Sequence, residues 1–209
     1  MRLILASTSP RRKEILGLLG TPFEVIAPDF TETLTHGRAI EQEVLDFAVG
    51  KAQSVASRQP ESIVVGSDTM IAIDGQKIGK PAGFVDARRI LRELSGKEHR
   101  ILTSVAIVDG QGGPGLTLVE EVRVKMHPYP AAEVDAYLAC NESFDKAGAY
   151  SIQGHGRALI ERIEGDYLAA VGLPLRPIAD YLSQRGVVIS RDIASLYRDR
   201  SFLNWATFE

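Results

Sequence analysis

Residues 2–12, Arg2-Leu3-Ile4-Leu5-Ala6-Ser7-Thr8-Ser9-Pro10-Arg11-Arg12, place an apolar run directly before a helix-start signal. The run from Arg2 to Ala6 predicts a strand. Ser9 is a favourable N-cap residue, and Pro10 suits the first helical position because its backbone angle is already helical. We therefore expect a strand followed at once by a helix, Pro10 to Leu19, closed by Gly20. This succession is typical of α/β folds.

The same alternation continues along the chain and predicts an α/β protein without internal repeats. Residues 39–57 carry apolar side chains at the spacing of one helical face. Two long β-rich runs, 100–108 and 116–126, flank the loop 109–115 and predict a hairpin. The remaining expected elements are short strands at 23–26, 63–66, 70–73 and 157–163, and helices at 84–94, 130–139 and 177–184.

Composition excludes several classes of protein. The chain has 209 residues, 44% of them hydrophobic, and no apolar run long enough to span a membrane. The apolar run before Ser7 has only four residues, fewer than a secretion signal needs. A net charge of −3 disfavours nonspecific binding to nucleic-acid polymers. The single cysteine, Cys140, excludes an internal disulfide, and we expect it to be a packed thiol in a cytoplasmic protein.

The basic start of the first helix is the first candidate site. Arg11, Arg12 and Lys13 crowd the positive end of the helix dipole, where each costs about 0.3–1 kcal/mol. A sequence tuned only for stability prefers acids there. Hydroxyls, free backbone N–H groups and guanidinium groups together suit a polyphosphate. The alternative is a solvated basic helix start that Glu14 partly compensates.

Asp68 is the second candidate. It lies just past the predicted strand 63–66, where open α/β sheets place ligands. Its carboxylate suits a divalent metal or the activation of a water molecule. An ordinary aspartate has a pKa near 3.9, which makes it a weak base at neutral pH unless a metal acidifies the water. The alternative is a turn aspartate that bonds its own backbone.

Other motifs carry less information. The string 110–115 matches G-x-G-x-x-G, but β-rich residues follow it, so a turn is favoured over a dinucleotide site. Gly79-Lys80-Pro81 is not a Walker-type loop, and its lysine is ordinarily just solvated. The four histidines, His36, His99, His127 and His155, lack the spacing of metal ligands.

The segment 145–154 has small residues that permit close approach of a flat ligand. It contains Gln153, whose side-chain amide can donate to a base carbonyl and accept from a ring N–H, as thymine or uracil requires. A flipped amide suits cytosine instead, so discrimination needs neighbours that fix it. A polar loop with a turn glycine is the alternative interpretation.

Taken together, ordered motifs along nearly the whole chain resemble the Maf family of nucleotide pyrophosphatases. They are Leu5–Arg12, Phe47-Ala48 with Lys51-Ala52, Gly66–Thr69, Gly79–Pro81, Leu94–Gly96 with His99 and Thr103, Asp145–Tyr150 with Ile152–Gly154, and Gly165–Tyr167 with Val171–Pro174. The resemblance implies a mixed α/β fold of the Maf/ITPase-like type, with two lobes around a deep cleft and often a homodimer. The domain would span 1–189, and 190–209 would be an extension of unknown role.

The resemblance also implies an activity and a set of site residues. Family members cleave nucleoside triphosphates to the monophosphate and pyrophosphate, and the form of 145–154 resembles the branch acting on dTTP and UTP. Asp68 would accept a proton, and Mg²⁺ or Mn²⁺ would bind Glu32 and Asp68. The substrate would contact Ser7, Arg11, Arg12, Lys51, Thr69, Lys80 and Gln153. A rival hypothesis is a nucleotide-binding regulator of cell division without essential catalysis.

One departure from the family pattern bears on the metal. The family often has Asp-x-Asp-Glu where this chain has Asp29-Phe30-Thr31-Glu32. An acid is therefore absent at Thr31, which weakens the expectation of metal ligation in this segment.

Overall fold

A computed structural model describes residues 2–35, 37–110 and 114–208. Within them, one seven-stranded sheet has the order β2-β1-β3-β5-β6-β7, with β4 paired to β3. The strands are β1 (Arg2–Ala6), β2 (Glu24–Val25), β3 (Ser62–Ile73), β4 (Gln76–Ile78), β5 (Glu98–Val108), β6 (Pro114–Met126) and β7 (Ile160–Glu164). β1 runs parallel to β2 and β3, and the other pairs are antiparallel. The mixed α/β fold is confirmed.

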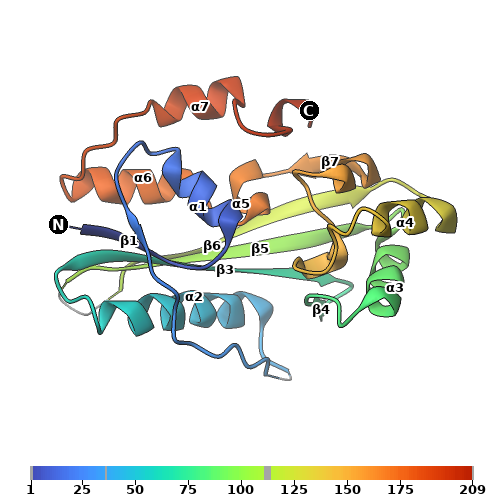
Figure 1. The fold of residues 1–209 in the computed structure, drawn as a ribbon, viewed down its shortest axis with the longest axis horizontal. Helices are drawn as coiled ribbons and strands as arrows, with labels where there is room; N and C mark the ends of the chain where they lie inside the picture. The colour runs from blue at the N-terminus through green and yellow to red at the C-terminus, as the bar shows by residue number, and fades with distance from the viewer. Residues whose placement is uncertain (1, 36, 111–113, 209) are drawn as a thin grey trace.

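Helices cover both faces of this sheet (Figure 1). α2 lies on one face, and α1, α5 and α6 lie on the other, while α3 and α4 pack at one end. Their bounds are α1 (Pro10–Gly17), α2 (Ile40–Ala56), α3 (Phe84–Leu94), α4 (Ala131–Leu138), α5 (Tyr167–Val171), α6 (Leu175–Gln184) and α7 (Ile193–Asp199). No helix in the described ranges is long and apolar enough to cross a membrane.

The β1–α1 unit forms as its sequence predicts. Ser9 caps α1 by accepting the Arg12 backbone N–H, and Pro10 occupies the first turn. Ile15 and Leu16 are buried on the sheet. The helix ends at Gly17, two residues before the predicted end at Leu19.

β3 differs from the prediction of two short strands because it is one continuous strand of 12 residues. Asp68 therefore lies inside β3, not past its end, which corrects the sequence interpretation. The register explains why the position is still open: β1 ends at Ala6, opposite Gly66, while β3 continues. Beyond Gly66, β3 is no longer paired with β1, so Asp68 lies beside the carboxyl end of β1.

Gly66 brings β3 close to α2. A Cβ at this position would lie 2.4 Å from the carbonyl oxygen of Ala48 and 2.8 Å from the backbone nitrogen of Ala52. Such contacts are far shorter than packing allows, so only glycine permits this approach. The close packing places Lys51 of α2 beside Asp68 of β3.

The predicted hairpin is confirmed, since β5 and β6 pair along their length. β6 begins at Pro114, within the glycine-rich string 110–115, so the string leads into a strand and not into a helix as a dinucleotide site requires. Residues 111–113 of that string lie outside the described ranges. The predicted strand 157–163 is shifted, because a 3₁₀ turn, His155–Leu159, precedes β7. Cys140 is exposed and not a core thiol, which corrects a second expectation.

Candidate functional site

A cavity of about 810 Å³ opens at the carboxyl end of β1, a size typical of small-molecule sites. One wall is the β1–α1 loop with the end of α5, and Gly79-Lys80 and the segment 145–153 line the cavity as well. α2 and the segment 27–34 close a third side. All the residues named from sequence line this one cavity: Ser7, Arg11, Arg12, Glu32, Lys51, Asp68, Thr69, Lys80 and Gln153.

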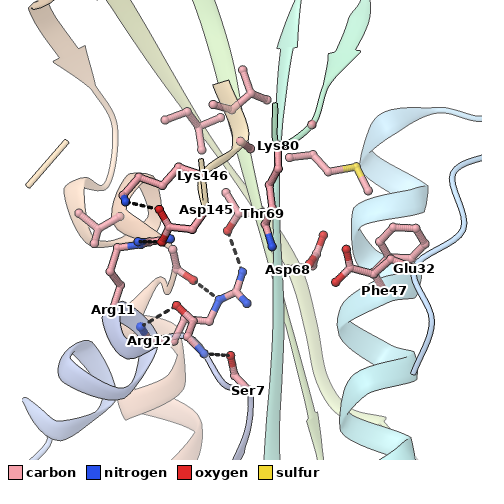
Figure 2. A pocket seen from close by; sticks show the side chains of 18 of the residues that line it. Ser7, Arg11, Arg12, Glu32, Phe47, Asp68, Thr69, Lys80, Asp145 and Lys146 are labelled. Atoms are coloured by element: carbon pink, nitrogen blue, oxygen red, sulfur yellow. Dashed lines mark hydrogen bonds and ion pairs between the residues drawn. The ribbon is translucent and has the colours of Figure 1, made fainter. Parts of the chain in front are cut away.

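Two carboxylates converge on one cation in this cavity. Lys51 Nζ lies 2.5 Å from Glu32 Oε1 and 2.5 Å from Asp68 Oδ1. Lys51 and Asp68 are both buried, while Glu32 reaches in from the exposed segment before α2. Figure 2 shows Glu32 and Asp68 facing each other, with Lys80 pointing into the same space.

Burial raises the pKa of Asp68, although the charges of Lys51 and Arg12 oppose the rise. A carboxylate with a raised pKa is a better base near neutral pH than an ordinary aspartate. Desolvation also disfavours the charge of Glu32, but the hydrogen bond and charge of Lys51, with help from Lys80 and Arg12, hold its pKa below the ordinary value. The two carboxylates are therefore tuned in opposite directions, with Asp68 suited to accept a proton and Glu32 to stay ionised.

Arg12 is half-buried and held by backbone and hydroxyl acceptors. Its Nε donates to the Gly172 carbonyl at 2.9 Å, and its Nη2 donates to Thr69 Oγ1 at 3.1 Å. Gly172 follows α5, so the carbonyl is one of those left free at a helix C-terminus, where partial negative charge favours a cation. Burial lowers the pKa of Arg12, and the charge of Asp68 opposes this shift.

A chain of hydroxyls fixes the direction of the Thr69 hydrogen bonds. Thr103 Oγ1 donates to the Ala169 carbonyl at 2.8 Å, so its hydrogen is used. Thr69 and Thr103 hydroxyls are 3.1 Å apart, and Thr69 must therefore be the donor of this bond. Thr69 can then accept from Arg12. Its hydroxyl thus anchors the guanidinium of Arg12 as well as lining the cavity.

Arg11 and its neighbours form a second charged group at the opposite rim. Arg11 Nη1 lies 3.3 Å from Asp145 Oδ2, and Lys146 Nζ lies 2.5 Å from Asp145 Oδ1. Figure 2 places these three side chains together above α1. Ser7 Oγ accepts the backbone N–H of Ser9 at 3.2 Å and so shapes the loop before the helix. Gln153 is on the same wall, and its Nε2 is buried without a hydrogen-bond partner among the described residues.

Sequence reasoning missed several members of this site. The sequence marks Asp145 and Lys146 only as part of a small-residue segment, and α5 is not among the elements that we expect from it. A signal for α5 exists: Asp166 precedes the apolar run 167–171, and Gly172 follows it. Asp166 caps this helix through the N–H groups of Leu168 and Ala169. The helix in turn presents the carbonyls that hold Arg12 and Thr103.

No histidine or cysteine among the described residues lines the cavity. His99 is buried against the Tyr150 hydroxyl at 2.7 Å, and burial lowers its pKa to about 4. Its ring is therefore neutral at physiological pH. No cluster of three or more His, Cys, Asp or Glu side chains suited to a metal occurs in the described part of the chain, and His36 lies outside it.

Known proteins resemble this chain over most of its length. The dTTP/UTP pyrophosphatase of Symbiobacterium thermophilum is 43% identical over 188 residues, covering 90% of this chain and 96% of the relative. Proteins with the same name from Dictyoglomus thermophilum and Bacillus cereus are 42% and 38% identical, covering 88% and 90% of this chain and 96% and 98% of their own. A solved nucleoside-triphosphatase, a dITP/XTP pyrophosphatase from Mycobacterium abscessus, overlaps with a TM-score of 0.43 at 17% identity, over 89% of this chain and 94% of its own.

The family described as Maf-like protein matches residues 2–185. This range contains every residue that lines the cavity and ends shortly before the C-terminal tail. With relatives up to 43% identical along the same range, the chain belongs to the Maf family.

Proposed function

We propose that this protein hydrolyses dTTP and UTP to the nucleoside monophosphate and pyrophosphate. The observation that carries the proposal is the single cavity that joins the basic start of α1 to Asp68, Glu32 and Gln153. Relatives that cover nearly the whole domain are named for this activity.

The cations of the cavity match a triphosphate chain. Arg11, Arg12 and Lys80 line it together with the start of α1, where free backbone N–H groups favour anions. Developing charge on the leaving pyrophosphate would be stabilised by these fixed cations, which is the main contribution a protein makes to phosphoryl chemistry. Arg11 is paired with Asp145 in this structure, so a bound phosphate would compete with that carboxylate.

Asp68 is proposed to accept the proton of the attacking water. Its Oδ1 is bonded to Lys51, and Oδ2 has no hydrogen bond within the described ranges, which leaves that oxygen for the water. The raised pKa of the carboxyl group brings its proton affinity closer to neutral pH.

Glu32 and Asp68 also fit a divalent cation, since carboxylate oxygens are the donors that Mg²⁺ and Mn²⁺ prefer. Both direct an oxygen at the position of Lys51 Nζ, so a metal held between them would displace this ammonium group. Thr31 adds no carboxylate, so phosphate oxygens and water would complete the ligand set. Bound there, the metal would neutralise phosphate charge and acidify water.

The base would be recognised at Gln153, which lines the same cavity as the start of α1. Its amide can donate to the O4 carbonyl and accept from N3–H of thymine or uracil. From the family resemblance we also propose a homodimer located in the cytoplasm; light scattering of the purified protein would measure its oligomeric state.

The test is a panel of nucleoside triphosphates with Mg²⁺ or Mn²⁺, scored by pyrophosphate release. We expect dTTP and UTP to be the best substrates. Asp68→Asn should lower kcat by at least about 100-fold, in line with the loss of a general base, while the melting temperature stays near wild type because Lys51 keeps Glu32 as a partner.

An active Asp68→Asn protein would remove Asp68 from the mechanism. Nucleotide binding with no release of pyrophosphate by the wild type would instead favour a regulator that binds nucleotides without turnover.

A further inference from the structure

The C-terminal tail, residues 190–208, packs on the domain beside α5 and α6 (Figure 1). Trp205 and Phe208 are buried and join the main hydrophobic core. The Trp205 ring stacks on Tyr167 of α5 with centroids 5.4 Å apart, and Tyr197 of α7 packs edge-on against it. The Tyr197 hydroxyl donates to Asp166 Oδ2 at 2.8 Å. The tail is therefore firmly docked, although the family match ends at residue 185.

The docked tail contacts the segment that carries Gln153. Asn204 Nδ2 donates to the backbone carbonyl of Gln153 at 2.7 Å. Arg157, four residues further on, donates to Thr207 Oγ1 at 2.8 Å and to the Thr207 carbonyl at 2.7 Å. Its guanidinium also lies 4.3 Å from the centre of the Phe208 ring. Both ends of the segment 153–157 are thus attached to residues 204–208.

The segment 153–157 is also held by a residue outside the tail, Glu142. Glu142 Oε2 accepts the backbone N–H of His155 at 2.9 Å, and a Cβ at Gly154 would meet the same carboxylate at 2.3 Å. Gly154 and Gly156 give the segment a large conformational freedom when it is not restrained. Glu142 bonds the peptide N–H of His155, and Asn204 bonds the peptide carbonyl of Gln153.

We propose that the tail is a positioning element for base recognition, in which Asn204 fixes the Gln153 peptide group and thereby the direction of the Gln153 side chain. The proposal rests on the proposed function of Gln153. An amide discriminates uracil and thymine from cytosine only while its orientation is fixed, since a flipped amide presents the complementary pattern. Gln153 Nε2 has no hydrogen-bond partner among the described side chains and backbone, so no contact of Nε2 orients the amide. The bond from Asn204 to the Gln153 carbonyl fixes the peptide group from which the side chain starts.

The test compares Asn204→Gly with wild type. Asn204 has a left-handed backbone, φ 59°, which glycine adopts without strain, so the variant removes the donor and leaves the turn intact. Asn141→Gly is the matched control: Asn141 has the same left-handed backbone, φ 56°, and its exposed side chain has no hydrogen bond in the part of the chain described here.

Steady-state kinetics with UTP, dTTP and CTP are the readout. For Asn204→Gly we expect KM for UTP and dTTP to rise by roughly 3- to 10-fold, the effect of losing one hydrogen bond, with kcat within about twofold of wild type. The preference for UTP over CTP should fall in parallel, and Asn141→Gly should change neither quantity.

A double-mutant cycle separates positioning from general stability. If Asn204 acts through Gln153, the variant Gln153→Ala should already have lost the preference, and adding Asn204→Gly should reduce it no further. Asn204→Asp, which puts a carboxylate against the carbonyl, should have the larger effect on KM. A folded Asn204→Gly protein with wild-type KM and base preference would overturn the proposal.

Failure of the proposed function gives a different result. A wild-type protein that releases no pyrophosphate from any nucleotide contradicts the activity itself. If the wild type is active and Gln153→Ala has the same KM and base preference, Gln153 does not recognise the base. The tail proposal is then contradicted as well. Wild-type activity that depends on Gln153 but not on Asn204 contradicts the tail proposal alone.

Discussion

Lys51 is the residue on which the charge balance of the site depends. Its ammonium group touches both Glu32 and Asp68, and it works against the burial that raises the pKa of Asp68. The same residue is unremarkable in the sequence, because nothing in an amphipathic helix marks one lysine as buried. Its role becomes visible only once Gly66 lets β3 approach α2.

Lys51→Met should shift the pH profile of catalysis. Removing the cation raises the pKa of Asp68 further, so the ionised form that accepts a proton is lost at a higher pH. The acid limb of kcat/KM should therefore move to higher pH than in wild type, and Lys51→Arg, which keeps the charge, should restore its position. Lys97→Met, which removes a lysine from an exposed pair with Asp74, is the control. An unmoved limb in Lys51→Met would contradict the proposed role of Asp68 as base.

Among the elements, β1, α1 and the β5–β6 hairpin could be predicted from sequence because their signals are local. Alternating or continuous apolar runs and a Ser-Pro cap need no information from distant residues. β3 could not be delimited in this way. Its polar centre, Ser67-Asp68-Thr69, interrupts the apolar pattern for a functional reason, and long-range pairing with β5 keeps the strand continuous. The prediction placed Asp68 just past the end of its own strand. In the structure Asp68 lies inside β3, beside the point where the neighbouring strand β1 ends.

The segment before α2 shows a second limit of local reasoning. Residues 26–35 have no regular secondary structure, yet they deliver Glu32 to the cavity. Buried Glu43 of α2 anchors them: its Oε1 accepts the Thr35 N–H and its Oε2 accepts Lys77 Nζ, both at 2.5 Å. Lys77 Nζ also donates to the Thr35 carbonyl at 3.2 Å. Three elements therefore meet at a residue that no motif distinguishes.

Glu43→Gln should loosen this anchor and weaken the metal site without touching it. A hydrogen bond to a charged group contributes about 1.5–3 kcal/mol, so we expect the metal concentration for half-maximal activity to rise about tenfold. The rate at saturating metal should stay near wild type, because Glu32 can still reach the cavity. Titration of activity with Mg²⁺ measures both quantities, and Gln42→Ala on the exposed side of α2 is the control. An unchanged titration in Glu43→Gln would show that Glu32 is positioned by other contacts.

At the scale of the whole molecule, three segments far apart in sequence are held together around the cavity. The tail begins against the end of α1, where Ser190 Oγ donates to the Gly20 carbonyl at 2.8 Å, and it finishes against the 153–157 segment. Gly20 has φ 66°, which other residues rarely adopt, and a Cβ there would lie 2.1 Å from Ser190 Oγ, so glycine favours this docking. The sequence predicted Gly20 as a helix terminator, but its contact with a tail 170 residues away has no local signature.

His99 connects β5 to the segment 145–154 and should make the free energy of unfolding depend on pH. Its ring, buried in β5, bonds Tyr150 at 2.7 Å, and its pKa is about 4 in the folded protein against an ordinary value of 6.5. The unfolded chain therefore binds this proton near pH 6.5, while the folded chain does so only near pH 4. Stability contributed by the neutral ring is complete above pH 6.5 and is lost as the pH falls toward 4, by about 3 kcal/mol in total.

Urea unfolding at pH 7 and pH 5 isolates this contribution when wild type is compared with His99→Gln, whose amide can still bond Tyr150 but does not titrate. We expect wild type to lose about 2 kcal/mol more than the variant between these two pH values. His127→Gln, at an exposed position, should behave as wild type. Equal losses in wild type and His99→Gln would mean that the folded protein accommodates a charged His99. Burial of the His99 ring against Tyr150 would then not be the cause of the loss of stability in acid.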